Sequence, residues 1–206
     1  MKLSELFTRC LTRSYTRIGD SVDYAVETEG DRLYVYFAAS DGEADWQKNL
    51  AFPPRPYRDA SGTRMVHGGF LTAWLQAEPY VLPSILDPSV REAVTVGYSH
   101  GAALAALCHE KLYCLRPDLR ATLLGYGFAA PRVMWGCFDK RRWEGFTVIR
   151  NLDDLITHLP PSIFGYRHVG RMLEIGEKGR YGRLEAHRPE SMTEELLRYE
   201  ENGSNR

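Results

Sequence analysis

The chain has 206 residues, of which 44% are hydrophobic and 26% are charged, and its formal net charge is −1. This length predicts one domain, residues 1–206, with a hydrophobic core of its own. The balanced charge gives no reason to expect nucleic acid as a partner. No apolar run approaches the roughly 20 residues that a membrane-spanning helix needs, so we expect no transmembrane segment.

Residues 1–20 combine apolar side chains at helical spacing with charges that interrupt every apolar run. The spacing predicts a helix packed on the surface of the domain, with a surface-seeking or targeting helix as the alternative. The interruptions leave no continuous hydrophobic segment of the kind a secretory signal needs. We therefore expect a cytoplasmic protein, with release by another route as the alternative.

The four cysteines form no CxxC pair and have no zinc-binding spacing. We therefore expect no bound metal, and thiols that are reduced and mostly buried. A disulfide between Cys108 and Cys114 is the alternative.

The predicted strands and helices alternate along most of the chain. Residues 22–28 and 33–39 predict a β-hairpin, and the proline-rich residues 41–65 predict a loop. Further strands are predicted at 92–98, 120–128, 145–151 and 170–176, and helices at 70–78, 101–113, 131–140 and 190–200. This order predicts an α/β fold with a mainly parallel sheet, helices on both faces, and the antiparallel hairpin at the N-terminus.

The last predicted helix has a capping box in Ser191 and Glu194. The residues that follow it, 200–206, are polar and predict a disordered tail.

A glycine-rich turn carries the strongest functional signal. The sequence GYSHG, residues 97–101, follows an apolar strand and precedes an alanine-rich helix. A serine at such a strand–turn–helix junction is lifted above the sheet, and the two glycines leave room for the tight turn. Ser99 is therefore the candidate nucleophile.

A serine nucleophile needs a base and a carboxylate that orients the base. In α/β folds with a serine at such a strand–turn–helix junction, the acid follows the serine in the chain and the histidine follows the acid. Asp153 and Asp154 both follow the strand 145–150, and position alone leaves either one open. His187, between the last strand and the last helix, is the preferred base, and His168 is the second candidate.

These residues also resemble a known family, the class 3 lipases, which are the fungal-lipase-like branch of the α/β hydrolases. The resemblance lies in collinear segments: VHGGF (66–70), GYSHGAALA (97–105), GFAAPRV (127–133), NLDDLITHLPP (151–161) and HRPES (187–191). It implies the α/β-hydrolase fold and places the catalytic acid at Asp154 rather than Asp153. It also implies hydrolysis of carboxylic esters, of the lipase or esterase type, through Ser99, Asp154, His187 and an acyl-enzyme, with no cofactor.

The chain departs from the family at two points. The family's FRGT-like strand end is Phe37-Ala38-Ala39-Ser40 here, so the resemblance implies an oxyanion hole made by the backbone N–H groups of Ser40 and His100. The segment that corresponds to a hydrophobic lid, 41–50, has few apolar residues. We therefore expect no strong interfacial activation and at most a transient contact with a lipid surface. Candidate lid or substrate-binding residues are Trp46, Leu50, Phe164 and Tyr166.

The expected substrate is a small-molecule ester or lipid. Two alternatives remain open at this point. One is a thioesterase, acyltransferase or phospholipase that uses the same three residues, and the other is a non-catalytic protein of this fold that binds a lipid or a partner.

Overall fold

The computed structural model describes residues 1–19, 22–39 and 53–204. Within them, the larger sheet has the strand order β1-β2-β3-β6-β7-β9-β11. The strands from β3 to β11 pair in parallel, whereas β1, β2 and β3 pair antiparallel. Their bounds are β1 (Thr16–Ile18), β2 (Val22–Glu29), β3 (Arg32–Phe37), β6 (Glu92–Tyr98), β7 (Leu124–Phe128), β9 (Phe146–Asn151) and β11 (Arg171–Ile175). This is the predicted sheet, with its N-terminal hairpin.

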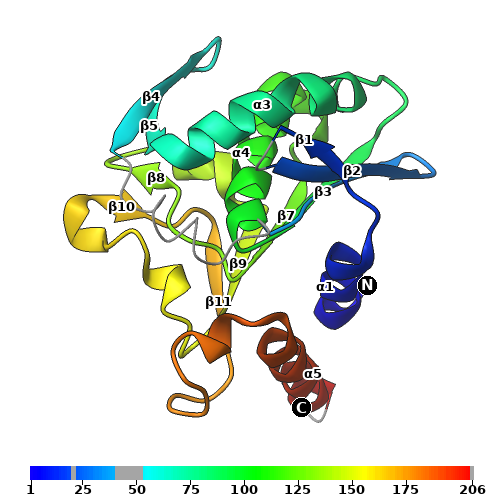
Figure 1. The fold of residues 1–206 in the computed structure, drawn as a ribbon. Coiled ribbons are helices and arrows are strands. Elements are labelled where there is room, and N and C mark those ends of the chain that lie inside the picture. The colour runs from blue at the N-terminus through cyan, green and yellow to red at the C-terminus, as the bar shows by residue number, and fades with distance from the viewer. Residues whose placement is uncertain (20–21, 40–52, 205–206) are drawn as a thin grey trace.

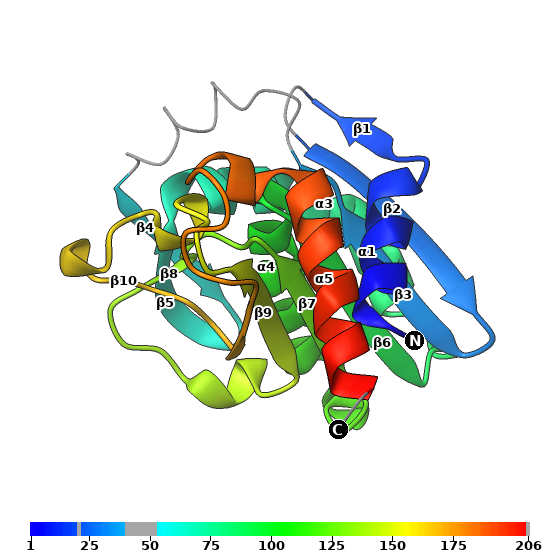
Figure 2. The ribbon, with the colours of Figure 1, turned by 90° about the horizontal axis from the view of Figure 1, so that it is seen from below.

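Helices cover both faces of this sheet (Figures 1 and 2). One face carries α3 (Gly68–Ile85) and α4 (His100–Leu115), and the other carries α1 (Leu3–Thr12) and α5 (Pro189–Ser204). The burial pattern of β3 explains this arrangement, because its five residues from Leu33 to Phe37 are all buried. Leu33 and Phe37 pack into the core beneath α3 and α4, whereas Tyr34 packs into the core beneath α1 and α5.

A second, smaller sheet lies beside α3 and α4, with the strand order β10-β8-β5-β4. Its strands are β4 (Pro54–Asp59), β5 (Gly62–His67), β8 (Met134–Trp135) and β10 (Tyr166–Arg167). The predicted loop over 41–65 is therefore wrong for the residues that form β4 and β5. Pro54 and Pro56 are compatible with a strand here because β4 is an edge strand, where a missing N–H breaks no ladder.

The helix predicted at 131–140 is also absent. This segment contains β8, and the short 3-10 helix η2 (Lys140–Trp143) begins only at its end. Gly136, directly after β8, has φ +73°, which is incompatible with a continuous α-helix.

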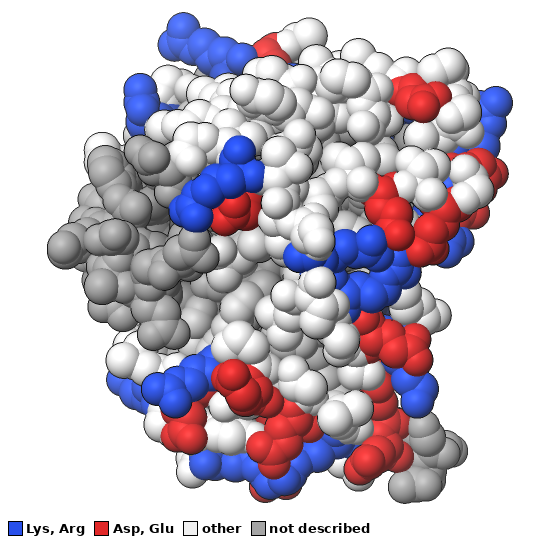
Figure 3. Space-filling model, turned by 45° about the vertical axis from the view of Figure 1, so that its right-hand side comes forward, with Lys and Arg blue, Asp and Glu red and all other residues white. Residues whose placement is uncertain are grey.

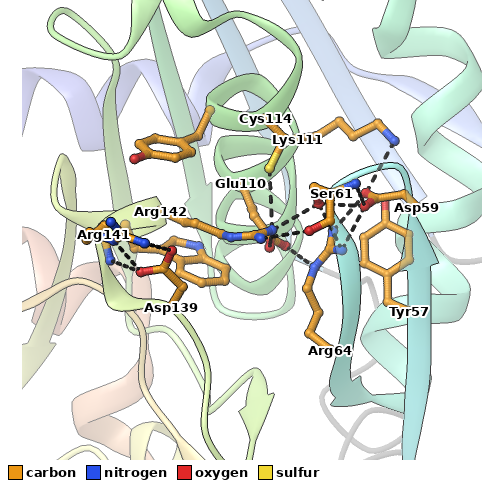
Figure 4. A network of polar contacts seen from close by, with 12 residues as sticks. Tyr57, Asp59, Ser61, Arg64, Glu110, Lys111, Cys114, Asp139, Arg141 and Arg142 are labelled. Atoms are coloured by element: carbon orange, nitrogen blue, oxygen red, sulfur yellow. Dashed lines mark hydrogen bonds and ion pairs between the residues drawn. The ribbon is translucent and has the colours of Figure 1, made fainter.

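An ion network joins the smaller sheet to α4 (Figure 4). Glu110 of α4 is fully buried, and its carboxylate accepts hydrogen bonds from Arg64 of β5 at 2.6 Å and from Arg142 of η2 at 2.9 Å. Arg64 also donates to both carboxylate oxygens of Asp59, each at 3.0 Å. Burial raises the pKa of Glu110, and the two guanidinium groups oppose that rise. The network holds the smaller sheet in a defined position beside the helix.

The two terminal helices differ from the prediction at their ends. Helix α1 stops at Thr12, and part of the predicted helical segment forms β1 instead. Helix α5 begins at Pro189, so Ser191 lies inside its first turn and does not form the predicted capping box. The same helix continues to Ser204, past the start of the predicted tail. Its Glu200 accepts hydrogen bonds from the backbone N–H and the hydroxyl of Ser4, at 2.9 and 2.6 Å, which ties α5 to α1.

All four cysteines are free thiols, so the alternative of a Cys108–Cys114 disulfide is wrong. Cys10 and Cys108 are buried, and burial raises the pKa of the Cys10 thiol to about 11. Among the described residues, no helix is both long enough and apolar enough to cross a membrane.

Charges of both signs are mixed on the face that Figure 3 shows. Charges of opposite sign also pair on the surface of the larger sheet, as between Arg9 of α1 and Glu27 of β2 at 2.9 Å. No large area of a single sign covers this face, as expected from the near-neutral net charge.

Candidate active site

The turn between β6 and α4 has the strained backbone of a nucleophile elbow. Ser99 has φ +54°, a conformation that non-glycine residues rarely adopt. The neighbouring glycines are required by close backbone contacts. A Cβ on Gly97 would lie 2.1 Å from the carbonyl oxygen of Gly101, and a Cβ on Gly101 would lie 2.2 Å from that of Phe37. The turn therefore presents Ser99 at the carboxyl end of β6, beside the end of β3.

Three residues that are far apart in the sequence form one hydrogen-bonded chain at this turn. Ser99 Oγ lies 2.8 Å from His187 Nε2, and His187 Nδ1 lies 2.8 Å from Asp154 Oδ2. The other carboxylate oxygen of Asp154 accepts the backbone N–H of Ile156 at 2.8 Å. Because a carboxylate only accepts hydrogen bonds, we assign the ring proton to Nδ1, which leaves Nε2 to accept the hydroxyl of Ser99.

Burial isolates this hydrogen-bonded chain from bulk water. The exposed fraction is 4% for Ser99, 5% for His187 and 0% for Asp154. Asp154 follows β9, and His187 closes the short 3-10 helix η5 (Glu185–His187), which lies between β11 and α5. Segments that follow the carboxyl ends of the parallel strands β6, β9 and β11 thus bring the three side chains together.

Tyr98 is a contact of His187 that sequence reasoning missed. Its ring stacks on the imidazole, with centroids 5.6 Å apart and planes at 23°, and its hydroxyl donates to the backbone carbonyl of His187. The only signal in the sequence was its position between Gly97 and Ser99, which says nothing about a partner 89 residues away.

The second candidates for acid and base lie elsewhere. The carboxylate of Asp153 accepts the backbone N–H groups of Gly179 and Tyr181, and these bonds lower its pKa. The ring of His168 contacts the carbonyl oxygen of Thr157 at 2.8 Å, and burial lowers its pKa to about 4. Neither side chain belongs to the hydrogen-bonded chain of Ser99. The described residues contain no group of three or more His, Cys, Asp or Glu side chains that could hold a metal ion.

A row of ring contacts leads away from the serine. The half-buried His100 is the first residue of α4, and the centroid of its ring lies 5.6 Å from that of Phe70. Burial and the nearby His67 lower the pKa of His100 to about 4. The ring of Phe70 packs on that of His67, with centroids 4.2 Å apart, and the ring centroids of His67 and Tyr166 of β10 are 5.7 Å apart.

The remaining candidates for substrate binding divide into two groups. Tyr166 is buried at the end of the row of rings, whereas Phe164 is 63% exposed on the short 3-10 helix η4 (Ser162–Phe164). Ser40, Trp46 and Leu50 lie outside the described residues.

Comparison with known proteins identifies the family. The sequence profile of the family Lipase (class 3) matches residues 34–164, which include the elbow and the Asp154 segment. The chain belongs to the class 3 lipase family.

Individual relatives agree with this family assignment. The lipase of Rhizomucor miehei is 34% identical over 147 residues, which is 67% of this chain and 40% of the relative. The secreted mono- and diacylglycerol lipase 1 of Fusarium solani is 26% identical over 162 residues, which is 75% of this chain and 47% of the relative. The chain thus spans less than half the length of these curated relatives.

A solved structure matches the fold. It is a triacylglycerol lipase whose catalytic centre is described as a serine protease triad, and it superposes with a TM-score of 0.67 at 25% identity. The match covers 80% of this chain and 67% of the other chain. The predicted α/β-hydrolase fold is confirmed.

Proposed function

We propose that this chain is a serine hydrolase of carboxylic esters, of the lipase or esterase type. One observation carries the proposal: the chain of hydrogen bonds from Ser99 through His187 to Asp154, located at a strained elbow. A hydroxyl, an imidazole and a carboxylate in this order are the groups that acyl transfer to serine requires.

The proposed reaction starts with proton transfer from Ser99 Oγ to His187 Nε2, while Oγ attacks the ester carbonyl. Asp154 keeps the proton on Nδ1 and stabilises the imidazolium that forms. His187 then protonates the leaving alcohol. In the second half of the reaction His187 activates a water molecule, which hydrolyses the acyl-enzyme and frees Ser99.

We assign the oxyanion hole to the backbone N–H groups of His100 and Ser40. His100 opens α4, and N–H groups at the start of a helix have no acceptor within the helix. The close approach of Gly101 to the carbonyl oxygens of Phe37 and Ala38 supports the second donor, because the chain leaves β3 beside the elbow. Loss of one such donor typically slows turnover by roughly a hundred- to a thousandfold.

The proposed substrate is an ester with an apolar acyl group. The buried rings of Phe70, His67 and Tyr166 pack against one another behind His100, so the surroundings of the elbow on this side are apolar. Ile163 and Phe164 of η4 are 84% and 63% exposed, and they are candidates for a transient contact with a lipid surface. The names of the relatives, a lipase and a mono- and diacylglycerol lipase, support the same substrate class.

A panel of p-nitrophenyl esters graded by acyl length tests the proposal. We expect turnover by the wild type and none above background by Ser99→Ala. A fluorophosphonate probe should label Ser99, at a rate that falls in a His187→Ala variant. Equal hydrolysis by the wild type and Ser99→Ala would contradict the proposal, as would a wild type that the probe does not label.

Two further measurements sharpen the proposal. Products formed in the presence of competing alcohols distinguish hydrolysis from acyl transfer. Rates on one ester below and above its solubility limit test the expected lack of strong interfacial activation, and a sharp rise at the limit would contradict it.

The cytoplasmic location is also part of this proposal. The free thiols, including the exposed Cys137, support this location, because cysteines without disulfide bonds are usual in a reducing compartment. The Fusarium solani relative, by contrast, is named a secreted enzyme. Fractionation of source cells decides the point, because accumulation of the protein in the medium would contradict a cytoplasmic location.

A further inference from the structure

The loop that delivers His187 is held by a carboxylate next to the proposed acid. This loop, residues 176–184, connects β11 to η5 and is defined here as the histidine loop. Asp153 Oδ2 accepts the backbone N–H of Gly179 at 2.8 Å and that of Tyr181 at 3.2 Å, and Oδ1 accepts the N–H of Gly179 at 2.9 Å. These bonds lower the pKa of Asp153, so it carries its charge throughout the neutral range.

The opposite side of the histidine loop is attached to α5. The hydroxyl of Tyr181 lies 2.9 Å from a carboxylate oxygen of Glu194 and 3.1 Å from one of Glu195. Arg180 contacts Glu195 at 3.1 Å. The loop is therefore fixed between Asp153 on one side and α5 on the other.

The chain beyond these attachments leads directly to the imidazole. The carbonyl oxygen of Arg183 accepts the N–H of Leu155 at 3.2 Å, which places the end of the loop against the residue that follows Asp154. The N–H of Ala186 then bonds to the carbonyl of Gly182 at 2.8 Å, and His187 follows. No long unattached segment separates Tyr181 from His187.

We infer that Asp153 is a positioning residue for the proposed reaction, which acts by holding the histidine loop so that His187 reaches both Ser99 and Asp154. The inference rests on the proposed function. The two neighbouring aspartates then have complementary roles: Asp154 contacts the imidazole of His187, whereas Asp153 contacts the backbone of the loop that carries it. This differs from a solvated carboxylate whose removal has little effect.

The test compares Asp153→Ala with Asp153→Asn and with Glu177→Ala. Glu177 lies in the same loop but is exposed, and its ion pair with Arg180 is long at 3.8 Å, so Glu177→Ala is the matched control. Asp153→Asn is the conservative variant, because one oxygen, Oδ2, accepts from both Gly179 and Tyr181 and an amide oxygen can replace it.

The readout is the rate constant of labelling by a fluorophosphonate probe, per titrated active site, together with kcat, KM and the melting temperature. Because small displacements of a catalytic group are costly, we expect Asp153→Ala to lower the labelling rate and kcat by about 10- to 100-fold, with little change in KM. Asp153→Asn should retain most of the rate, and Glu177→Ala should match the wild type.

The outcomes separate this inference from the proposed function. A wild type that is not labelled contradicts both. A labelled wild type with Asp153→Ala labelled at the same rate contradicts only the inference. Equal losses in Asp153→Ala and Asp153→Asn also contradict it, because the asparagine keeps the hydrogen-bond acceptor. A loss in Asp153→Ala that is absent in the two other variants supports it.

Discussion

Two buried polar clusters meet the same helix, α4, and they are built in opposite ways. At the start of the helix, Ser99 contacts His187, which contacts Asp154. Further along, Glu110 contacts Arg64 and Arg142. Both clusters join α4 to segments that are remote in the sequence.

The difference lies in how the charges are balanced. The fully buried carboxylate of Glu110 lies between two guanidinium groups, which compensate its charge. Each of its two oxygens accepts a hydrogen bond from one of these groups. At the site, one buried carboxylate faces an imidazole, and the serine hydroxyl lies on a turn with φ +54°. The balanced cluster fits a structural role in fixing the smaller sheet, whereas the unbalanced one beside a strained turn fits the catalytic role proposed for Ser99.

The largest expected effect is the loss of activity when Ser99, in the first of the two clusters, is replaced. Ser99→Ala should lower kcat by about a millionfold if the proposed mechanism holds, because residues of such a triad act as a unit. It should not lower the melting temperature, because alanine has the same backbone strain as serine in this turn. Esterase assays and thermal unfolding measure both quantities. Residual activity within a hundredfold of the wild type would contradict the role of Ser99.

The opposite pattern is expected for Glu110→Gln. Removal of the charge leaves Arg64 and Arg142 without the buried carboxylate that they share, which should destabilise the fold by about 3 kcal/mol. The folded fraction should keep the kcat of the wild type. Urea unfolding measures the change, with Asp118→Asn as the control, because Asp118 pairs with Arg116 but is 52% exposed in its side chain. A loss no larger than that of the control would show that the network contributes little.

A third buried group on α4 predicts a dependence of stability on pH. His109 precedes Glu110 and is 1% exposed, and burial lowers its pKa to about 3. The unfolded side chain titrates near 6.5. Below that pH the unfolded chain binds a proton that the folded chain does not, so His109 alone should lower the free energy of unfolding by about 2 kcal/mol between pH 7 and pH 5. His100 and His168, whose pKa values burial also lowers to about 4, add to this fall.

Urea unfolding at several pH values checks this slope. His109→Gln removes the titrating ring, so its slope between pH 7 and pH 5 should be shallower than that of the wild type. Identical slopes would mean that His109 is not the group responsible.

The smallest expected effect concerns Tyr98. Tyr98→Phe keeps the ring that stacks on His187 but removes the hydroxyl that donates to the carbonyl of His187. Loss of one hydrogen bond of this kind is worth about 1 kcal/mol, so kcat/KM should fall by about fivefold. Tyr113→Phe, which changes a hydroxyl at the other end of α4, should have no effect. Equal rates for both variants would show that the hydroxyl does not hold the imidazole.

Local patterns predicted the parts of the fold that local forces determine. Three such patterns reflect preferences of adjacent residues: the alternation around 22–37, the apolar run at 92–98 and the glycine-flanked serine. The structure contains the corresponding hairpin, strand and elbow. The hairpin at 54–67 was missed because its prolines oppose a strand locally. Only its place at the edge of a second sheet, attached through Glu110, makes that conformation favourable.

The sequence by itself determined the N-terminal hairpin and the parallel strands of the larger sheet, the tight turn at Ser99 and a short set of candidate acids and bases after it. The tertiary structure decided which candidates meet: Asp154 rather than Asp153 contacts His187, and His187 rather than His168 contacts Ser99. The physical reason is that neighbouring aspartates on one loop point to different partners, and those partners come from chain segments that only folding brings within hydrogen-bond distance.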